Sequence, residues 1–203
     1  MHWSLTLVTG PGLEPISRDD AKLWLRLDHT TEDTLVDSLI QMVREQIEER
    51  GIAVVTQTWD LRLDGFPSVI RIPKTPIESV SSISYIDANG DTQTLAESKY
   101  TVDVQSTPAR IVPAYGTSWP STRSEPNAVT VRFVAGYGAG ATPAGATPEA
   151  TPGATPEAMA GEIPERILQA MRLALTTAYT MRADHEAAQT AVARVLDNYA
   201  LYY

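Results

Sequence analysis

The stretch TEDTLVDSLIQMVREQIEERG, Thr31–Gly51, predicts the helix around which the rest of this chain is arranged. Thr30 or Thr31 can cap its start, and Gly51 can end it, because glycine accepts the left-handed conformation found after helices. Apolar residues recur at helical spacing and form one stripe: Leu35, Val36, Leu39, Ile40, Val43 and Ile47. One helix of this length cannot bury its own stripe, so other helices must cover it.

Two further segments have helical periodicity and can supply that cover. The first is Arg18–Leu27, which begins after the capping residue Ser17. Its expected apolar side consists of Ala21, Leu23, Trp24 and Leu27. The second begins at Pro164, a residue that suits the first turn of a helix, and continues to Tyr199 with a possible break near 182–185. Its stripe includes Ile167, Leu168, Met171, Leu175, Ala178, Tyr179, Val192 and Val195.

Between these helical parts the period changes to that of β-strands. In 56–64 the residues Trp59, Leu61 and Leu63 alternate with polar ones, which predicts a strand with one buried face. Asn89-Gly90 is typical of a two-residue type I′ hairpin turn. Further short strands are expected at 69–72, 80–86, 92–95, 100–104, 110–112 and 127–135. Residues 56–135 are therefore expected to form a small antiparallel sheet unit.

The fold class that follows is α+β: a small bundle of about four helices with an inserted antiparallel β-sheet unit and an extended linker rich in Pro, Thr, Ala and Gly. Residues 1–16 look extended, because Pro11 and Pro15 oppose a regular helix. The expected parts are an N-terminal extended segment with a helical pair (1–55), the β region (56–135), the linker (136–162) and the C-terminal helices that complete the bundle (163–203).

The linker repeats Gly-Ala-Thr-Pro at 140, 145 and 153 and has almost nothing to bury within its own subunit. Its Thr-Pro steps favour extended backbone, so we expect it to act as a strap along a neighbouring chain. The residues of this inter-subunit strap are Thr142, Pro143, Thr147, Pro148, Thr151, Pro152, Thr155 and Pro156. The chain ends in NYALYY, an aromatic segment that either folds onto its own bundle or anchors an interface.

Composition excludes several classes of function. The chain of 203 residues carries a net charge of −9, which opposes a tight grip on nucleic acid phosphates but permits DNA to pass without sticking. No apolar run is long enough to span a membrane, and the first residues lack the basic region of a signal peptide. Cysteine is absent, so thiol chemistry is excluded.

The sequence offers little sign of catalysis. His2, His29 and His185 lack metal-ligand spacing, and the glycines at 136–140 are not followed by the Lys-Ser/Thr of a phosphate loop. Asp60 and Asp64 share a predicted strand face and could form a glycosidase pair, although solvent-facing charges on a soluble sheet are the simpler interpretation. We predict no catalytic residue, no metal and no cofactor. Trp24, Trp59, Trp119 and Phe133 are most simply core residues.

Several strings occur in a characteristic order along nearly the whole chain. They are EPIS (14–17), DAKLWLRLD (20–28), TQTWDLRLDGFP (56–67), PARI (108–111), YGTSWP (115–120), NAVTVRFVAGYG (127–138) and IPERILQA (163–170). In this order they resemble the head–tail connector (adaptor) family of tailed bacteriophages and gene transfer agents. The sequence departs from the family in its Gly-Ala-Thr-Pro repeats, which lengthen a short link, and in a C-terminal helix that looks short and directly continuous.

The resemblance implies a structural virion protein without catalysis or cofactor. Such adaptors form a ring, usually of about twelve subunits, below the portal protein at the neck of the particle. The ring passes DNA as cargo and is the platform for a stopper, tail-completion or tail terminator protein; it assembles in the host cytoplasm without a membrane. It also implies portal binding by the C-terminal residues Tyr199, Leu201, Tyr202 and Tyr203. The alternatives are another neck or tail-completion protein and a glycoside hydrolase that uses Asp60 and Asp64.

Overall fold

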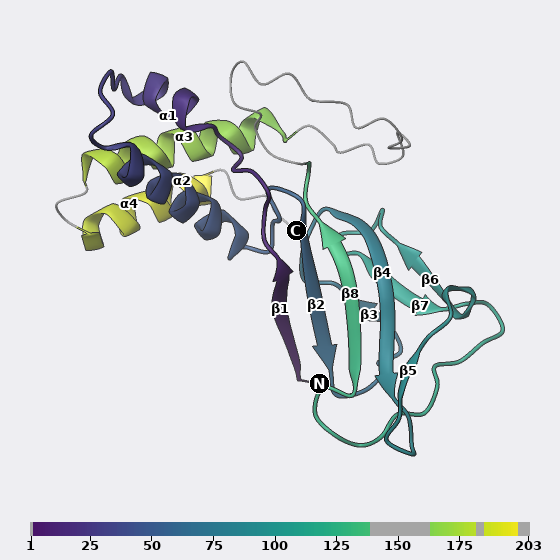
Figure 1. Ribbon diagram of the computed structural model, residues 1–203. Helices are drawn as coiled ribbons and strands as arrows, with labels where there is room; N and C mark the ends of the chain where they lie inside the picture. The colour runs from purple at the N-terminus through teal and green to yellow at the C-terminus, as the bar shows by residue number, and fades with distance from the viewer. Residues whose placement is uncertain (1, 139–162, 182–184, 199–203) are drawn as a thin grey trace, which may run out of the picture. The chain divides into compact units, whose positions relative to one another are not determined.

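The computed structural model describes residues 2–138, 163–181 and 185–198 (Figure 1). Helices and antiparallel sheets are both present, so the predicted α+β class is confirmed. Internal contacts divide the chain into two compact units. Of the described residues, 2–10 and 56–136 form the β unit, and 11–55, 137–138, 163–181 and 185–198 form the helical unit.

The helical unit contains α1 (Arg18–Leu25), α2 (Asp33–Glu48), α3 (Glu165–Thr180) and α4 (His185–Asn198). α1 packs on α2 and α3, and α4 packs on α3 and α2. The stripe predicted for α2 lies at the centre of the core: Val36, Leu39, Ile40, Val43 and Ile47 are buried together with Ile167, Ala170, Met171, Ala174, Leu175 and Ala178 of α3. Covering α2 with helices from both ends of the chain buries the stripe that it could not bury alone.

The ends of α2 follow the prediction only in part. Gly51 follows the helix with a φ of 85°, the left-handed conformation expected of it. The start is different: the capping residue is Glu32, which makes no side-chain capping bond. The hydroxyl of Thr31 is instead 2.9 Å from Nδ1 of His29. The expectation that Thr30 or Thr31 caps the helix was therefore wrong, because the Thr31 hydroxyl is engaged within the preceding loop.

α1 begins as predicted, with the amide of Asp20 donating to Oγ of Ser17 at 3.1 Å. It ends at Leu25, before the predicted Leu27, because Arg26 turns into the left-handed region with a φ of 59°. The predicted apolar side is wrong for two residues. Leu23 is 79% exposed and Trp24 is 43% exposed, while only Ala21 of this helix is fully buried.

The β unit contains two antiparallel sheets. In neither sheet do the strands lie side by side in their order along the chain. The larger sheet has the order β1 (Trp3–Thr9), β2 (Gln57–Leu63), β8 (Val129–Ala135), β4 (Ile77–Ile86), β5 (Thr92–Thr94). The smaller has the order β3 (Ile70–Arg71), β7 (Arg110–Pro113), β6 (Tyr100–Asp103), with a short 3-10 helix, Glu97–Lys99, before β6. Residues 1–16, expected only to be extended, thus begin with an edge strand of the larger sheet.

Cross-strand register explains where the core of the β unit lies. Trp59, Leu61 and Leu63 of β2 pair with Phe133, Val131 and Val129 of β8, and their side chains share one face of the larger sheet. Leu61, Leu63 and their β8 partners are buried, as are Ile70 and Ile111 of the smaller sheet. The predicted alternation of β2 is confirmed for its apolar face, and both sheets contribute buried apolar residues.

The β4–β5 hairpin has a different turn from the predicted one. A type I′ turn needs positive φ at both Asn89 and Gly90. Only Gly90 has it, at 96°, whereas Asn89 is not among the residues with positive φ. The carboxylate of Asp87 accepts hydrogen bonds from the amides of Asn89 at 2.9 Å and Asp91 at 3.1 Å. These bonds hold a type I turn closed by a left-handed glycine, the three-residue form of hairpin loop.

Candidate assembly surfaces

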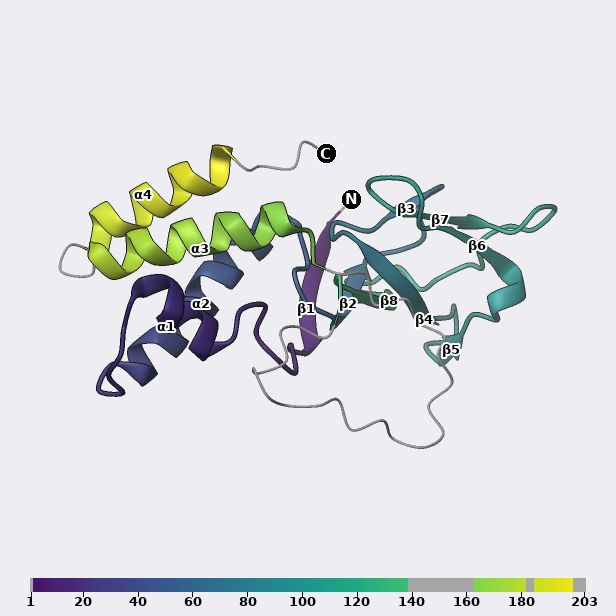
Figure 2. The same cartoon turned by 90° about the horizontal axis from the view of Figure 1, so that it is seen from above.

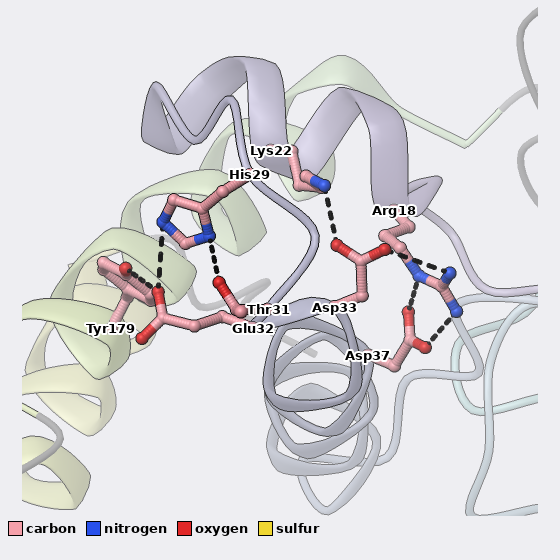
Figure 3. A network of polar contacts seen from close by, with 8 residues as sticks. All are labelled: Arg18, Lys22, His29, Thr31, Glu32, Asp33, Asp37 and Tyr179. Carbon is pink, nitrogen blue, oxygen red and sulfur yellow. Dashed lines mark hydrogen bonds and ion pairs between the residues drawn. The ribbon is translucent and has the colours of Figure 1, made fainter.

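A polar network fixes α1 on α2 (Figure 3). The guanidinium of Arg18 donates two hydrogen bonds to the carboxylate of Asp37, the one from Nε at 2.7 Å, and lies 3.7 Å from Asp33. Lys22 donates to Asp33 at 2.6 Å. The hydrogen bond to Asp37 raises the pKa of Arg18 above its ordinary value. These pairs set the orientation of α1 and so determine which of its side chains face outward.

A second arm of the network joins the α1–α2 loop to α3 (Figure 3). The hydroxyl of Tyr179 donates to Oε2 of Glu32 at 2.5 Å, and Nε2 of His29 lies 3.8 Å from the same oxygen. His29, which the sequence left without a metal partner, is thus part of the contact between the α1–α2 loop and α3. Its other ring nitrogen faces Thr31. Each polar group of this network is bonded to another group of the network. The network does not contain a nucleophile aligned with a base, as a catalytic site would need.

Arg44 fixes the chain that enters the helical unit. It is buried in α2, where Nε donates to Glu14 at 2.8 Å and Nη1 donates to Glu48 at 2.8 Å. Burial lowers its pKa, but the hydrogen bond to Glu14 and the charge of Glu48 outweigh burial, so the pKa is raised. A buried cation with two carboxylate partners holds residues 11–17 on α2.

Exposed apolar side chains lie on α1 and α3, two helices that pack together. We call Leu23, Trp24 and Leu173 the helical patch; Leu173 is 39% exposed. The indole of Trp24 donates to Oγ1 of Thr176 at 2.9 Å, and the guanidinium of Arg172 lies 5.9 Å from its ring centre. Trp24 is therefore held in a defined position while nearly half of it stays exposed. An ordered, exposed tryptophan is a typical anchor of protein interfaces.

A second exposed surface is the edge strand β1. It pairs with β2 on one side only, and every residue of Trp3–Thr9 except the half-buried Leu5 is exposed. Trp3 is 58% exposed, and Leu7 and Val8 are also exposed. An edge strand of this length with exposed apolar residues is a ready template for contact with another chain. The alternation in WSLTLV could have indicated this strand from the sequence alone.

The two carboxylates considered as an alternative glycosidase pair have separate structural partners. Asp60 is buried and accepts hydrogen bonds from Arg132 at 2.8 and 2.9 Å. Asp64 accepts from the amide of Asn127 at 3.1 Å. The interpretation of Asp60 as a solvent-facing charge was wrong, because Arg132 on β8 covers it. Both carboxylates hold β2 to the segment that contains β8.

Phe133 is fully buried, so its prediction as a core residue is confirmed. Trp59 and Trp119 are only half-buried, and Trp119 stacks on Phe66 with ring centres 4.8 Å apart. Within the described ranges, no group of three or more His, Asp or Glu side chains could hold a metal ion. None of the helices described here is both long and apolar enough to cross a bilayer.

The residues predicted for portal binding and for the strap fall outside the described ranges. This applies to Tyr199, Leu201, Tyr202 and Tyr203 and to the Thr-Pro steps between 142 and 156. The surfaces that the structure adds are the helical patch and β1.

Comparison with known families shows what part of this chain is similar to. The family described as phage gp6-like head-tail connector protein matches residues 16–114, which span α1, α2 and the strands up to β7. Over residues 16–114 the chain is therefore similar to the head–tail connector family. The resemblance found in the sequence is thereby confirmed. A search of curated proteins found no match.

Solved structures share this fold over nearly the whole chain. A chain from the virion of a native gene transfer agent (GTA) particle has a TM-score of 0.68 and 19% identity, with 94% of this chain and 93% of that chain covered. A chain from the neck of an empty GTA particle, computed with C6 symmetry, has the same TM-score and identity, with coverages of 95% and 94%. A chain from the neck of a native GTA particle, computed with C12 symmetry, has a TM-score of 0.62 and 20% identity, with coverages of 95% and 94%. At this level of identity the likeness establishes the fold.

Proposed function

We propose that this protein is a head–tail connector that forms a ring in the neck of a virus-like particle, beneath the portal protein. The observation that carries the proposal is the family match of residues 16–114. The fold is shared with a chain of a GTA neck computed with C6 symmetry and a chain of a GTA neck computed with C12 symmetry. This likeness supports a ring of about twelve copies. The ring would pass DNA and present a platform for a stopper, tail-completion or tail terminator protein.

A closed ring needs two different patches on each subunit, one for each neighbour. Among the described residues, the helical patch and the edge strand β1 are two such exposed surfaces. Both carry a tryptophan, and aromatic side chains are enriched where interfaces are most tightly packed. We assign contacts between neighbouring copies to these two surfaces.

The strap and the C-terminal tail complete the proposed assembly. The linker of 136–162 would lie along a neighbour, and Tyr199, Leu201, Tyr202 and Tyr203 would bind the portal. We propose a separate role for each of the four parts of the chain. Residues 1–55 form the bundle, 56–135 the β region, 136–162 the strap, and 163–203 the helices that close the bundle. Net charge supports the passage of DNA, because a charge of −9 keeps phosphates from sticking.

We propose that the protein is not an enzyme. Its two candidate catalytic carboxylates are used in other ways, with Asp60 bound to Arg132 and Asp64 bound to the amide of Asn127. A glycosidase acid or nucleophile must instead face the substrate. Another neck or tail-completion protein is the nearer alternative, and it would differ in its partner.

Deletion of Ala200–Tyr203 tests the portal contact. Truncated and full-length proteins are mixed with DNA-filled, portal-bearing heads and sedimented. The full-length protein should co-sediment, whereas the truncated one should stay in the supernatant with an unchanged circular dichroism spectrum. Co-sedimentation of the truncated protein would place the portal contact elsewhere, and failure of the full-length protein to bind heads would contradict the connector function.

A further inference from the structure

The β unit contains an apolar pocket of about 430 Å³ beside its edge strand β1. Both sheets line it: Trp3, Leu61 and Leu63 belong to the larger sheet, and Ile70 and Arg71 to the smaller. The remaining lining residues are Pro67, Ser68, Val69, Ile72, Pro73 and Pro108. Three prolines and a tryptophan thus surround one concave site.

The pocket lies where the larger sheet extends beyond the buried core of the unit. Trp3 and Leu5 pair with Leu63 and Leu61, so they continue the apolar face of β2 onto β1. Leu61 and Leu63 are buried, whereas Trp3 is 58% exposed. On the opposite layer β3 is an edge strand that pairs only with β7. In the view from above, β1 lies at one margin of this unit, away from β6 (Figure 2).

The charge at the pocket indicates what it can hold. Arg71 lines it, is exposed, and has no hydrogen bond or ion pair among the described residues. The chain itself contains a segment of matching chemistry: Ala-Thr-Pro-Glu occurs twice, at 146–149 and at 154–157. Each copy places a carboxylate directly after a proline. A ligand that suits this site would place a proline ring against its apolar walls and a carboxylate beside Arg71.

We propose that this pocket is the binding site for the Ala-Thr-Pro-Glu repeats of the linker. Thr-Pro steps favour the polyproline II conformation, which loses little entropy on binding and is recognised by grooves lined with aromatic side chains. Trp3 supplies the aromatic wall, and Arg71 pairs with Glu149 or Glu157. In the ring, a neighbouring copy supplies the repeat, a point that rests on the strap of the proposed function.

A labelled peptide provides the test. The peptide carries residues 141–158, and the receptor is the full chain with residues 140–161 replaced by a Gly-Ser segment of equal length, so that its own repeats do not compete. Fluorescence anisotropy should show saturable binding with a Kd below about 1 mM. Trp3→Ala and Arg71→Glu should each weaken binding by about fivefold or more. Circular dichroism should show that these exposed substitutions leave the fold unchanged.

Charge reversal and a matched control make the result specific. A peptide with Glu149→Lys and Glu157→Lys should bind the Arg71→Glu receptor better than the unchanged peptide does. Arg62→Glu is the control, because Arg62 is exposed on β2 but alternates with Leu61 and Leu63 and so lies on the other face. The control should bind within about twofold of the parent receptor.

The proposal is overturned by absence of saturable binding, by equal loss in the Arg62→Glu control, or by failure of the charge-reversed peptide to recover binding. The connector function is tested separately by sedimentation with portal-bearing heads. If heads bind the full-length protein but no receptor binds the peptide, only the assignment of the pocket is contradicted. Peptide binding without attachment to heads would instead contradict the connector function.

Discussion

Asp60 and Arg132 are register partners on β2 and β8, and two hydrogen bonds of 2.8 and 2.9 Å join their side chains. The two partners differ in exposure. The side chain of Asp60 is 7% exposed, whereas that of Arg132 is 47% exposed. Their pairing fixes the two central strands of the larger sheet, and the difference in exposure makes the two residues unequal when one is removed.

We expect Arg132→Ala to destabilise the protein more than Asp60→Ala. Removing Arg132 leaves the buried carboxylate of Asp60 without its cation, whereas removing Asp60 leaves a half-exposed guanidinium that water already solvates, so the first loss should be the larger. Urea unfolding of the two variants measures the difference. Equal losses, or a larger loss for Asp60→Ala, would show that the pair is not the buried-acid arrangement described.

Asp103 should make stability depend on pH at the acid end. A hydrogen bond from the Ser106 hydroxyl and another from Arg110 lower its pKa to about 2. Because the folded pKa lies below the unfolded value of about 3.9, the stabilisation is fully present above that value and is lost as pH falls through about 2. Asp103→Asn should remove this part of the pH dependence. NMR titration of the carboxyl group checks the pKa, and a midpoint near the ordinary value would contradict the assignment.

The helical patch should matter for assembly but little for the fold of the subunit. Leu23→Glu changes a side chain that is 79% exposed, so the free energy of unfolding should stay within about 0.5 kcal/mol of the parent. The substitution places a charge in the proposed contact between neighbouring copies. Ring formation on portal-bearing heads, and with it binding to the heads, should therefore weaken. Ser38→Glu, at an exposed position of α2, adds the same charge outside the patch and should bind normally. Equal behaviour of the two variants would argue against this surface.

Replacement of residues 140–161 by a short Gly-Ser segment separates the strap from the fold. Thermal stability of the isolated subunit should hardly change, because the replaced segment has few apolar side chains to bury. Assembly should weaken. Differential scanning calorimetry measures the first effect, and a large fall in the melting temperature would show that the segment packs within its own subunit.

The assembled ring should not bind duplex DNA tightly. Its subunits each carry a net charge of −9, and the channel is expected to be acidic or neutral. Binding measured at several salt concentrations should be weak and nearly independent of salt, because few phosphates are neutralised. Tight binding with a steep salt dependence would reveal a basic channel.

The local periodicity of the sequence was sufficient to predict the helices. The features that the sequence did not predict depend on contacts between residues far apart in the chain. The stripe of α2 was correct because any amphipathic helix of this length must be covered. The burial of Asp60 could not be predicted, since its partner Arg132 lies 72 residues away. Leu23 was misplaced because helical spacing does not show which side of α1 its neighbours cover, and in the structure only Ala21 of this helix is fully buried.

The pocket beside β1 was beyond sequence reasoning for the same reason. It depends on the pairing of β1 with β2 and on where β3 lies, and residues 3–9 are separated from β2 by the start of the helical unit. The predicted tail and strap residues fall outside the described ranges and stay predictions.

Native mass spectrometry of the purified protein with its portal tests the central proposal most directly. The mass of the complex minus that of the portal ring, divided by the subunit mass of 22.1 kDa, counts the attached copies. A head–tail connector should add a full ring of about twelve copies, the number expected from a closed cyclic assembly. A single attached copy, or no complex with the portal at all, would contradict the account.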